Sequence, residues 1–331
     1  RVLILTKADA DESNTKYAQG GIAAVLNNSL DSTKKHIEDT LRAGDGLCDK
    51  KIVRTVVEEG PALLKELIDW GAKFDYGKLG ELSLGLEGGH SANRIIHHKD
   101  TTGFEIEQML LKRVKKNKNI TLLSDYFAID LIIDKQEITK SSKTQSQCYG
   151  AYIFSKKEKT TIICEAKITL LATGGIGEVY LNTTNPSIAT GDGIAMAYRA
   201  NAEIEHMEFI QFHPTALYAP QKRPSFLISE AVRGFGAILR TKSGSDFMHN
   251  YDERKELAPR DIVSRAIISE LHKNKDSFVY LDCRHLDQEA FKSSFPNIWK
   301  NCHESGIRLE TEMIPVVPAA HYLCGGIKTN E

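Results

Sequence analysis

The chain alternates short apolar runs with longer stretches in which apolar residues recur every three or four positions. The short runs predict strands, over residues 1–6, 120–123, 127–134, 148–155, 160–165 and 167–172. The periodic stretches are bounded by capping residues, prolines and glycines and predict helices, over residues 32–43, 49–59, 61–70, 103–117, 194–198, 229–233, 260–272 and 288–304. The polar stretch 135–147 is predicted to be a solvated hairpin tip without a function.

The order of these elements predicts two domains. Helices and strands alternate in residues 1–206, which is typical of an α/β sheet, here with a small antiparallel layer added. Residues 207–322 mix short strands, loops and helices and are typical of an inserted α+β domain, and residues 323–331 start the return to the first domain. The loop 75–103 is rich in glycine, and so long a loop in a compact domain is usually functional or disordered.

Residues 169–218 are the stretch around which the rest is organised. An apolar run ends at Gly174-Gly175, which predicts a buried strand followed by a glycine turn. Residues 190–193, Thr-Gly-Asp-Gly, then lead into apolar residues at helical density. A helix that begins there presents free backbone N–H groups to whatever precedes it. The stretch also contains His213-Pro214-Thr215.

Composition excludes several classes of function. The chain has 43 basic and 44 acidic residues, a balance that does not indicate a nucleic acid or an anionic membrane as partner. No apolar run approaches the ~20 residues of a membrane span, and the start of the chain does not have the pattern of a signal peptide. The six cysteines include no C-x-x-C pair, which predicts reduced thiols in the cytoplasm. His97-His98 lack a carboxylate at ligand spacing, so no metal site is predicted.

Taken together, these motifs resemble the FAD-dependent succinate dehydrogenase/fumarate reductase flavoprotein family, and most closely its aspartate-oxidising branch. The resemblance runs from the first residue to the last. It implies a Rossmann-like FAD-binding domain, N-terminally truncated, over 1–206 and a capping domain over 207–322. No complete G-x-G-x-x-G occurs in the chain. The resemblance aligns residue 1 with the second strand of the FAD domain, so we expect both ends to belong to a longer protein.

The resemblance also assigns a flavin site. The pattern S-x-T-x-x-A-Q-G-G-I is intact from Ser13 to Ile22. The implied cofactor-binding residues are Lys7, Asn14, Thr15, Lys16, Tyr17, Ala18, Gln19, Gly20, Gly21 and Asp192. Two adjacent glycines let a backbone approach a flat ring closely; the residue types alone favour an ordinary βα loop with a glycine turn, and the intact pattern favours a flavin site. Respiratory members of the family carry a histidine bonded to FAD where this chain has Asn14, so the FAD is expected to be non-covalent.

A substrate site is implied in the same way. In the family, the two histidines and the Ser/Thr-Glu segment contact a substrate carboxylate, which assigns these roles to His213, His321, Ser229 and Glu230. The arginine of the P-R-D motif transfers the proton, which assigns this role to Arg260. An arginine stays charged and can act only within a relay, for which Glu230 is the predicted partner. The structural alternatives stay open, because Arg260 can cap or pair on a helix and a lone histidine is more often structural than catalytic.

Glu87, which precedes Gly-Gly-His, separates the branches of the family. Succinate dehydrogenases and fumarate reductases have an apolar residue at this place. A carboxylate here is the expected partner of an α-ammonium group, which aspartate has and succinate lacks. Because an unpaired carboxylate in a closed site is costly, such a site selects an amine. The alternative is a solvated loop carboxylate, one among 44 acidic residues.

The resemblance therefore implies oxidation of L-aspartate to iminoaspartate with FAD, reoxidised by oxygen or fumarate, as the first step of NAD biosynthesis. The product would pass to quinolinate synthase, and hinge motion of the cap would admit substrate. Two alternatives remain. One is a soluble fumarate reductase or succinate dehydrogenase flavoprotein, against which Asn14 and Glu87 argue. The other is a non-catalytic fragment that binds no FAD, because the glycine loop is absent.

Overall fold

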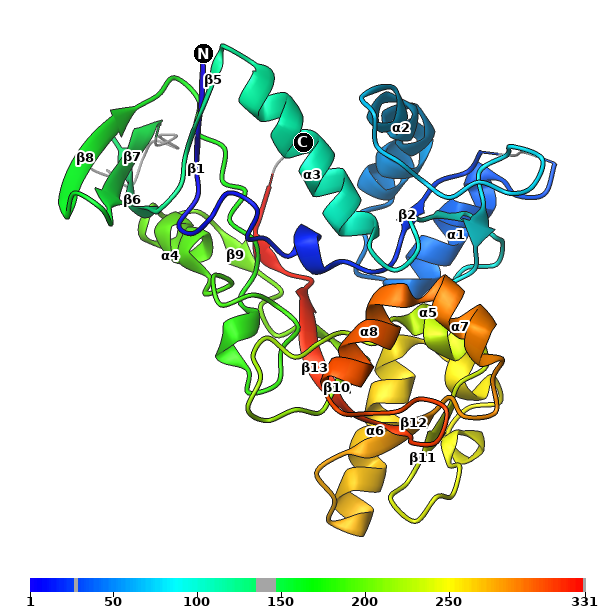
Figure 1. Ribbon diagram of the computed structural model, residues 1–331. Coiled ribbons are helices and arrows are strands. Elements are labelled where there is room, and N and C mark those ends of the chain that lie inside the picture. Colours follow the sequence, from blue (N-terminus) through cyan, green and yellow to red (C-terminus); the bar gives the residue numbers. More distant parts are fainter. Residues whose placement is uncertain (27–28, 135–146, 330–331) are drawn as a thin grey trace.

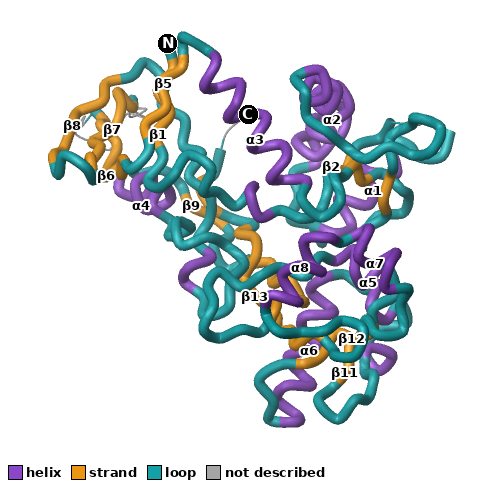
Figure 2. Tube along the Cα trace, viewed as in Figure 1, coloured by secondary structure: helices purple, strands orange, loops and turns teal. Residues whose placement is uncertain are grey.

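The computed structural model describes residues 1–26, 29–134 and 147–329. Figures 1 and 2 show the elements from β1 to β9 in one part of the molecule and those from β10 to β12 in the other, with β13 running from one toward the other. The predicted hairpin tip lies almost wholly outside the described residues. Among the described residues, no helix is long and apolar enough to span a membrane.

The first part contains several small sheets. β1 (Val2–Leu5) pairs in parallel with β5 (Ile120–Leu123), and α3 (Thr102–Lys116) leads directly into β5. β6 (Tyr126–Ile133), β7 (Cys148–Ser155) and β8 (Thr160–Glu165) form an antiparallel meander. The remaining strands are short and form two antiparallel sheets, β2 (Ile22–Ala23) with β4 (Ile95–Ile96) and β3 (Leu84–Gly85), and β9 (Ile204–Glu205) with β14 (Gly326–Ile327).

The two helices predicted over residues 49–59 and 61–70 form a single helix. α1 (Thr33–Ala43) is as expected, with the Ser32 side chain accepting a hydrogen bond from the Lys35 amide at its start. α2, however, is continuous from Lys50 to Asp69, with Pro61 inside it. Proline removes one helical hydrogen bond, but Val57 and Leu64, one on each side of Pro61, are both buried and lie on the same helical face. Burial of that face holds the helix together across the proline.

The predicted strand over residues 167–172 is not formed. The prediction that the stretch 169–218 opens with a buried strand was therefore wrong. A strand needs a neighbour to pair with, and no strand of the described residues pairs with this segment. Ile168 and Leu170 are 86% and 84% exposed.

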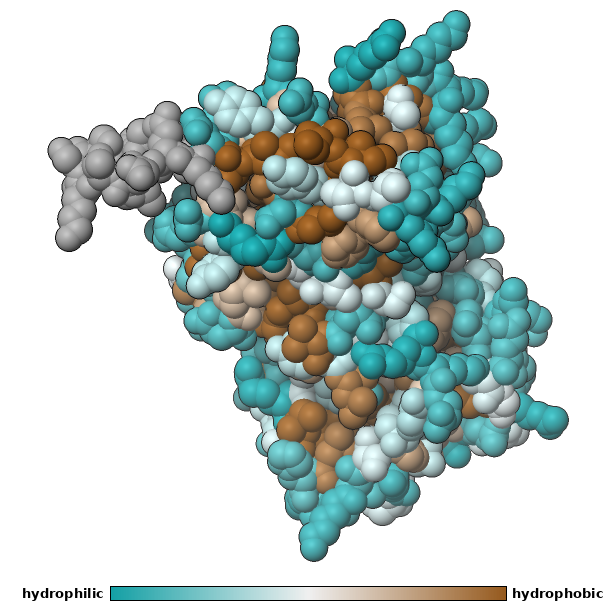
Figure 3. All heavy atoms as spheres, turned by 90° about the vertical axis from the view of Figure 1, so that its left-hand side faces the viewer, coloured by the Kyte–Doolittle hydropathy of each residue, from teal (hydrophilic) through white to brown (hydrophobic). Residues whose placement is uncertain are grey.

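β1 forms but is not buried, since Val2 is 55% exposed. Figure 3 shows apolar side chains gathered on one face of this part of the molecule. The next predicted element, α4 (Asp192–Arg199), is present.

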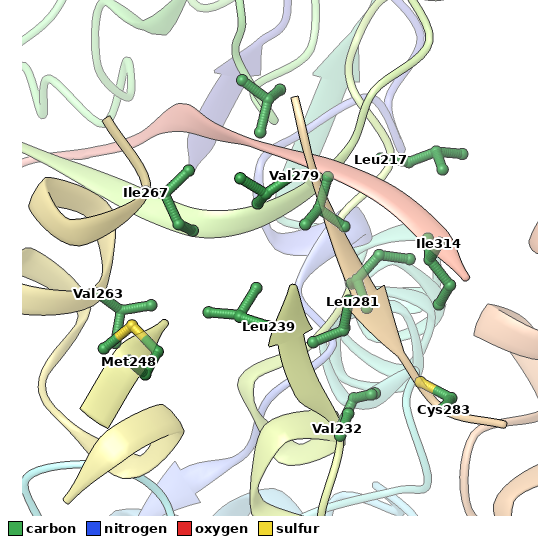
Figure 4. Close-up of a cluster of buried hydrophobic side chains, with 14 of the residues drawn as sticks. Leu217, Val232, Leu239, Met248, Val263, Ile267, Val279, Leu281, Cys283 and Ile314 are labelled. Atoms are coloured by element: carbon green, nitrogen blue, oxygen red, sulfur yellow. The ribbon is translucent and has the colours of Figure 1, made fainter. Parts of the chain in front are cut away.

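The second part is organised around an antiparallel sheet in the order β10 (Ile210–Leu217), β13 (Ile314–Leu323), β12 (Val279–Asp282) and β11 (Ile238–Arg240). Its core is made by residues between Leu217 and Val317. In Figure 4, Leu239, Leu281, Val263 and Ile267 surround one interior. Each is completely buried, and each such burial contributes about 1.5–3 kcal/mol. The predicted domain boundary stays a prediction.

Helices cover this sheet. α5 (Glu230–Gly234) and α6 (Arg260–Asn274) lie where helices were predicted. The single helix predicted over 288–304 is divided into α7 (Gln288–Ser294) and α8 (Pro296–Glu304). The cause is local, because proline disfavours helical geometry in the residue before it. Phe295 has φ −128° and ψ 57°, and Pro296 starts the second helix.

Candidate functional site

Arg260 and Glu230 lie at the centre of the candidate site. Each is the first residue of a helix, Glu230 of α5 and Arg260 of α6. The Arg260 Nε atom donates to Glu230 Oε2 at 2.5 Å, and its Nη1 atom donates to Gln211 Oε1 at 2.9 Å. The predicted pair is therefore in contact. The contact of Gln211 with Arg260 was not predicted, although Gln211 lies two residues before His213 in the same motif.

Glu230 is held between two guanidinium groups. It is 7% exposed, and its Oε1 atom lies 3.5 Å from Arg233 Nη2. Burial opposes ionisation of Glu230, but the charges of Arg260 and Arg233 outweigh it and hold its pKa below the usual value. Burial lowers the pKa of Arg233, whose Nε and Nη2 atoms have no hydrogen-bond partner within the described part of the chain. Arg260, Glu230 and Arg233 thus form a continuous line of ionisable groups.

The Ser229 side chain has a structural role at the start of α5. Its hydroxyl oxygen accepts a hydrogen bond from the Ala231 amide at 3.3 Å and caps the helix. Ser229 is buried beside Glu230. The hydroxyl proton remains available for donation, and the predicted contact with a substrate carboxylate stays a prediction.

Glu87 belongs to this cluster rather than to the solvent. The amide of its neighbour Gly88 donates to Glu230 Oε1 at 3.1 Å, and the Gly21 amide donates to the Glu87 carboxylate. Burial raises the pKa of Glu87; the Arg260 charge acts against this and the Glu230 charge adds to it. A Cβ atom on Gly20 would lie 3.1 Å from Glu87 Oε1. The loop around Glu87 therefore joins the predicted flavin loop to the predicted substrate residues.

The two predicted histidines are neighbours. The rings of His213 and His321 are 5.3 Å apart, edge to face. His213 is 1% exposed, and burial, followed by the Arg260 charge, holds its pKa well below the usual value. The same two causes lower the pKa of His321 to about 4. Both rings are therefore neutral at neutral pH. His213 Nδ1 accepts from the Thr215 amide at 3.3 Å, which leaves the proton on Nε2.

The predicted flavin loop packs against the start of α3. It contains a single 3₁₀ turn, η1 (Thr15–Tyr17), and the Gly103 amide donates to Ala18 O at 2.9 Å. Gln19 is 5% exposed; its Nε2 atom donates to Leu227 O at 2.7 Å, and its Oε1 atom is buried without a partner in the described residues. Gly21 is closely packed, since a Cβ atom there would lie 2.2 Å from Ile96 O.

Not every residue of the loop is free to contact a ligand. The Lys16 Nζ atom lies 3.0 Å from Asp11 Oδ2, and the Tyr17 hydroxyl lies 3.1 Å from the carboxylate of Glu12. These two side chains are engaged by the acidic residues that precede the loop. Asn14 lies beside the glycine turn that follows residues 168–172, with its Nδ2 atom 3.4 Å from the position of a Cβ on Gly174.

Lys7 and Asp192, the two remaining predicted flavin residues, form an ion pair. Lys7 follows β1, and Asp192 is the first residue of α4. Lys7 Nζ also donates to Thr190 Oγ1 at 2.5 Å. A carboxylate at a helix N-terminus is favoured by the helix dipole, and the lysine balances its charge. The structure therefore brings together two predicted residues that are 185 positions apart.

Arg94 supports the loop that carries Glu87 and was not among the predicted site residues. Its side chain is 1% exposed and makes a two-pronged contact with Asp31, with both N–O distances 2.7 Å, while Nη1 donates to Asp39 Oδ2 at 2.7 Å. The Ser91 amide and hydroxyl donate to the same Asp39 oxygen. The loop is thus anchored to α1. Nothing in the residue pattern distinguished Arg94 from the other basic residues.

His97 and His98 have a structural partner. His97 Nδ1 lies 2.9 Å from Asp75 Oδ2, and His98 Nδ1 lies 3.8 Å from Asp75 Oδ1. Within the described residues, no group of three or more histidines, cysteines or carboxylates could hold a metal ion.

Comparisons with known proteins agree on one family. A family model described as an FAD binding domain matches residues 1–331. The chloroplastic L-aspartate oxidase of Oryza sativa subsp. japonica is 49% identical over 99% of this chain and 51% of its own length. L-aspartate oxidase 1 of Ralstonia nicotianae is 49% identical over 100% of this chain and 61% of its own length. The chain thus spans about half to three fifths of these relatives.

Solved structures support the fold. A mutant of the E. coli quinol fumarate reductase is 30% identical, with a TM-score of 0.89, over 99% of this chain and 57% of that chain. The Mycobacterium smegmatis Sdh1 complex in the apo form is 31% identical, with a TM-score of 0.78, over 100% of this chain and 56% of that chain. The α/β fold of FAD-binding flavoprotein subunits is therefore confirmed for the described residues.

Proposed function

Because this chain belongs to the FAD-dependent succinate dehydrogenase/fumarate reductase flavoprotein family, we propose that it catalyses the oxidation of L-aspartate to iminoaspartate. The observation that carries the proposal is the position of Glu87. Its carboxylate lies against the predicted flavin loop at Gly20 and Gly21 and beside the Arg260–Glu230 pair. A carboxylate in that position can pair with an α-ammonium group, and the relatives named L-aspartate oxidase support the same substrate.

The residues present fit FAD, the cofactor that the family match indicates. The buried Gln19 Oε1 atom lacks a partner in the described residues, and Gly174, with φ 70°, places backbone without a side chain beside Asn14. We propose that Asn14, Thr15, Gln19, Gly20 and Gly21 hold the flavin ring system. When bound, FAD supplies the acceptor for the hydride that leaves the substrate.

The remaining predicted cofactor residues have less direct support. The ion pair of Lys7 and Asp192 lies at the N-terminus of α4, a position suited to polar groups of a ligand. The side chains of Lys16 and Tyr17 are already paired with acidic residues, so only their backbone is offered to a ligand. Asn14 cannot bond covalently to a flavin as a histidine does, so we propose that the FAD is non-covalent.

The chain's own residues provide binding and proton transfer. Oxidation of the α-ammonium form removes a hydride from the α-carbon and a proton from the nitrogen, and leaves the protonated imine. We propose that Glu87 orients the ammonium group, while neutral Nε2–H groups of His213 and His321 and the Ser229 hydroxyl donate to substrate carboxylates. A proton can then pass along Arg260, Glu230 and Arg233. The 2.5 Å contact between Arg260 and Glu230 supports this, because a guanidinium can transfer a proton only within such a pair.

The test is a Glu87→Gln variant of the protein that contains this chain. We expect kcat/KM for aspartate to fall about 100-fold, because losing a buried charge partner costs about 3 kcal/mol. Turnover of succinate, which lacks the ammonium group, should change less than threefold. Retention of FAD, measured from the visible absorption spectrum after desalting, should be unchanged. Glu81→Gln, at an exposed glutamate of the same glycine-rich loop, is the matched control.

Two outcomes would count against the proposal. Unaltered preference for aspartate over succinate in Glu87→Gln would remove the ammonium role of Glu87. Loss of flavin in that variant would show a structural role instead. The second candidate function, a soluble fumarate reductase or succinate dehydrogenase, is favoured by the similar solved structures at 30–31% identity. Rapid fumarate reduction without aspartate oxidation by the unmodified protein would favour it.

The electron acceptor, the enzyme that receives the product and the cellular location are also proposals. A small-molecule substrate is compatible with the site, and we propose oxygen or fumarate as the electron acceptor and quinolinate synthase as the enzyme that receives the product. We propose a cytoplasmic location, although the rice relative is named chloroplastic. Fractionation of cells that produce the protein, with an activity assay on each fraction, tests the location.

A further inference from the structure

Residues 182–185 form a hydrogen-bonded clamp on the end of β13, next to His321. The Ala320 amide donates to Asn182 O at 2.9 Å, and the Thr184 amide donates back to Ala320 O at 3.1 Å. The Thr183 hydroxyl also donates to Ala320 O, at 2.9 Å. Asn185 Nδ2 donates to His321 O at 2.9 Å. These four hydrogen bonds fix the backbone of Ala320 and His321, and so the position from which the His321 ring extends.

The clamp is itself tightly supported. η2 (Gly177–Val179) packs on it so closely that a Cβ atom on Gly177 would lie 2.2 Å from Asn185 Oδ1 and 2.6 Å from Thr183 Oγ1. Thr183, Thr184 and Asn185 are all buried. A polar segment that is buried and fully bonded to one strand end holds its side chains in defined directions.

The Thr184 hydroxyl touches the imidazole ring itself. Its Oγ1 atom lies 2.6 Å from His321 Nδ1. In the described residues this is the one hydrogen bond found for that hydroxyl, and Thr184 is 7% exposed. If Nδ1 carried the ring proton, the buried hydroxyl proton would have no acceptor, which is unfavourable. If the hydroxyl donates to Nδ1, every proton in the contact has an acceptor.

We propose that Thr184 is a positioning residue, whose hydroxyl donates to His321 Nδ1 and so holds the proton of the neutral ring on Nε2. That nitrogen then serves as a donor to a substrate carboxylate. The proposal rests on the proposed function, in which His321 contacts substrate. His213 offers a parallel, because its Nδ1 accepts from the backbone amide of Thr215 and its proton is likewise left on Nε2.

The neighbourhood explains why the choice between the two nitrogens matters. An imidazolium donates from both nitrogens, but burial and the Arg260 charge lower the pKa of His321 to about 4, so the ring is neutral at neutral pH. A neutral ring that carried its proton on Nδ1 would present an unprotonated Nε2 to a carboxylate, and the contact would be repulsive. The donor to Nδ1 therefore decides whether the ring attracts or repels the substrate.

The first test observes the unmodified protein and uses one variant only to assign its signals. In the intact protein labelled with ¹⁵N-histidine, the two-bond ¹⁵N–¹H spectrum distinguishes a ring protonated on Nε2 from one protonated on Nδ1. We expect the signals assigned to His321, identified by their absence from His321→Ala, to show protonation on Nε2 at pH 7. Protonation on Nδ1 would overturn the proposal, whether or not the protein oxidises aspartate.

The second test uses variants of the clamp. Thr184→Val keeps the branched shape but loses the hydroxyl, and we expect the KM for aspartate to rise about tenfold with kcat changed less than threefold. Thr184→Ser restores the hydroxyl and should bring KM to within about threefold of the unmodified protein. Thr183→Val is the matched control, because it removes a bond to the backbone and not to the ring. It should lower the melting temperature without changing which nitrogen of His321 carries the proton.

The two proposals fail in distinguishable ways. If the unmodified protein does not oxidise aspartate but His321 is protonated on Nε2, the proposed reaction fails and the positioning role stands. If aspartate is oxidised and Thr184→Val leaves both KM and the ring signals unchanged, the positioning role fails. In a His321→Ala background, Thr184→Val should not raise KM further, and an undiminished effect there would show that Thr184 acts through another residue.

Discussion

At the scale of single residues, two neighbouring carboxylates have opposite environments. Glu230 lies between Arg260 and Arg233, which hold its pKa below the usual value despite its burial. Glu87 lacks so close a cationic partner, and burial raises its pKa. Pairs of acids whose pKa values are pushed apart are typical of sites that divide charge stabilisation from proton transfer. Glu230 is therefore ionised in the resting site and suited to accept the proton of the proposed relay, and Glu87 is suited to receive a cation that completes its pairing.

Asp39, which anchors the loop of Glu87 to α1, gives a prediction for stability. Burial opposes its ionisation, but hydrogen bonds from Arg94 and Ser91 hold its pKa at about 2. Because this is below the unfolded value, the group contributes stability that is present above pH ~4 and lost as the pH falls toward 2. Asp39→Asn should lower the free energy of unfolding by about 2 kcal/mol at pH 7. Denaturant titrations at pH 7 and pH 3 measure this.

Arg42→Ala is the control for Asp39, because the Arg42 side chain, 71% exposed, pairs with the same carboxylate from the solvent side. Its effect should stay below about 1 kcal/mol. Equal losses in Asp39→Asn at pH 7 and pH 3 would show that ionisation of Asp39 does not support the loop.

At the scale of elements, the sequence pattern predicted those helices and strands whose bounds are determined by interactions between residues close in the sequence. The strands β7 and β8 and the helix α1 have bounds close to those predicted, because alternation and capping are readable within a few residues. The continuity of α2 was not predictable from Pro61, because it depends on a distant surface that buries Val57 and Leu64. Residues 167–172 have the composition of a strand but no partner strand among the described residues, and pairing is a non-local property.

The contact between α3 and the predicted flavin loop gives the second prediction. Gly103, in the first turn of α3, allows that approach, since a Cβ atom there would lie 1.9 Å from Thr15 O and 2.7 Å from Ala18 Cβ. Gly103→Ala must therefore displace the loop. We expect FAD, measured by its absorbance after equilibrium dialysis, to bind about tenfold more weakly, a loss of about 1.4 kcal/mol.

Gly234→Ala is the matched control for Gly103→Ala. Gly234 ends α5, and an added Cβ would meet nothing within 4 Å. FAD binding should be unchanged in this control. Unchanged FAD affinity in Gly103→Ala would mean that the loop between Asn14 and Gly21 does not hold the flavin.

At the scale of the whole molecule, the candidate site lies where two packed regions meet. One hydrophobic cluster includes Ala24, Leu64 and Met109, and the other lies between Leu217 and Val317. The hydrogen bonds from Gln19 to Leu227 O and from Gly88 to Glu230 cross between them. Motifs could identify the residue types on each side. They could not show Gln211, Thr184 or Arg94, whose roles come only from what lies next to them in space.

Asp100 forms a third link between the two regions and gives the last prediction. It is 1% exposed, and its Oδ2 atom accepts from the Ile298 amide, at the start of α8, at 2.8 Å. Removing the acceptor leaves that amide unbonded, so Asp100→Ala should lower the free energy of unfolding by about 2 kcal/mol. Hydrogen exchange at the Ile298 amide should also become faster, and the KM for aspartate should rise because the two sides of the site separate more readily.

Asp100→Asn distinguishes hydrogen bonding from charge. Burial raises the pKa of Asp100, so its neutral form contributes stability that is complete below the unfolded pKa and is lost as the pH rises through the folded one. The amide variant keeps an acceptor for Ile298 without the buried charge, and its free energy of unfolding at pH 7 should lie within about 1 kcal/mol of the unmodified protein. If both variants exchange the Ile298 amide at the unmodified rate, Asp100 does not hold the regions together, and closure of the site must depend on Gln19 and Gly88.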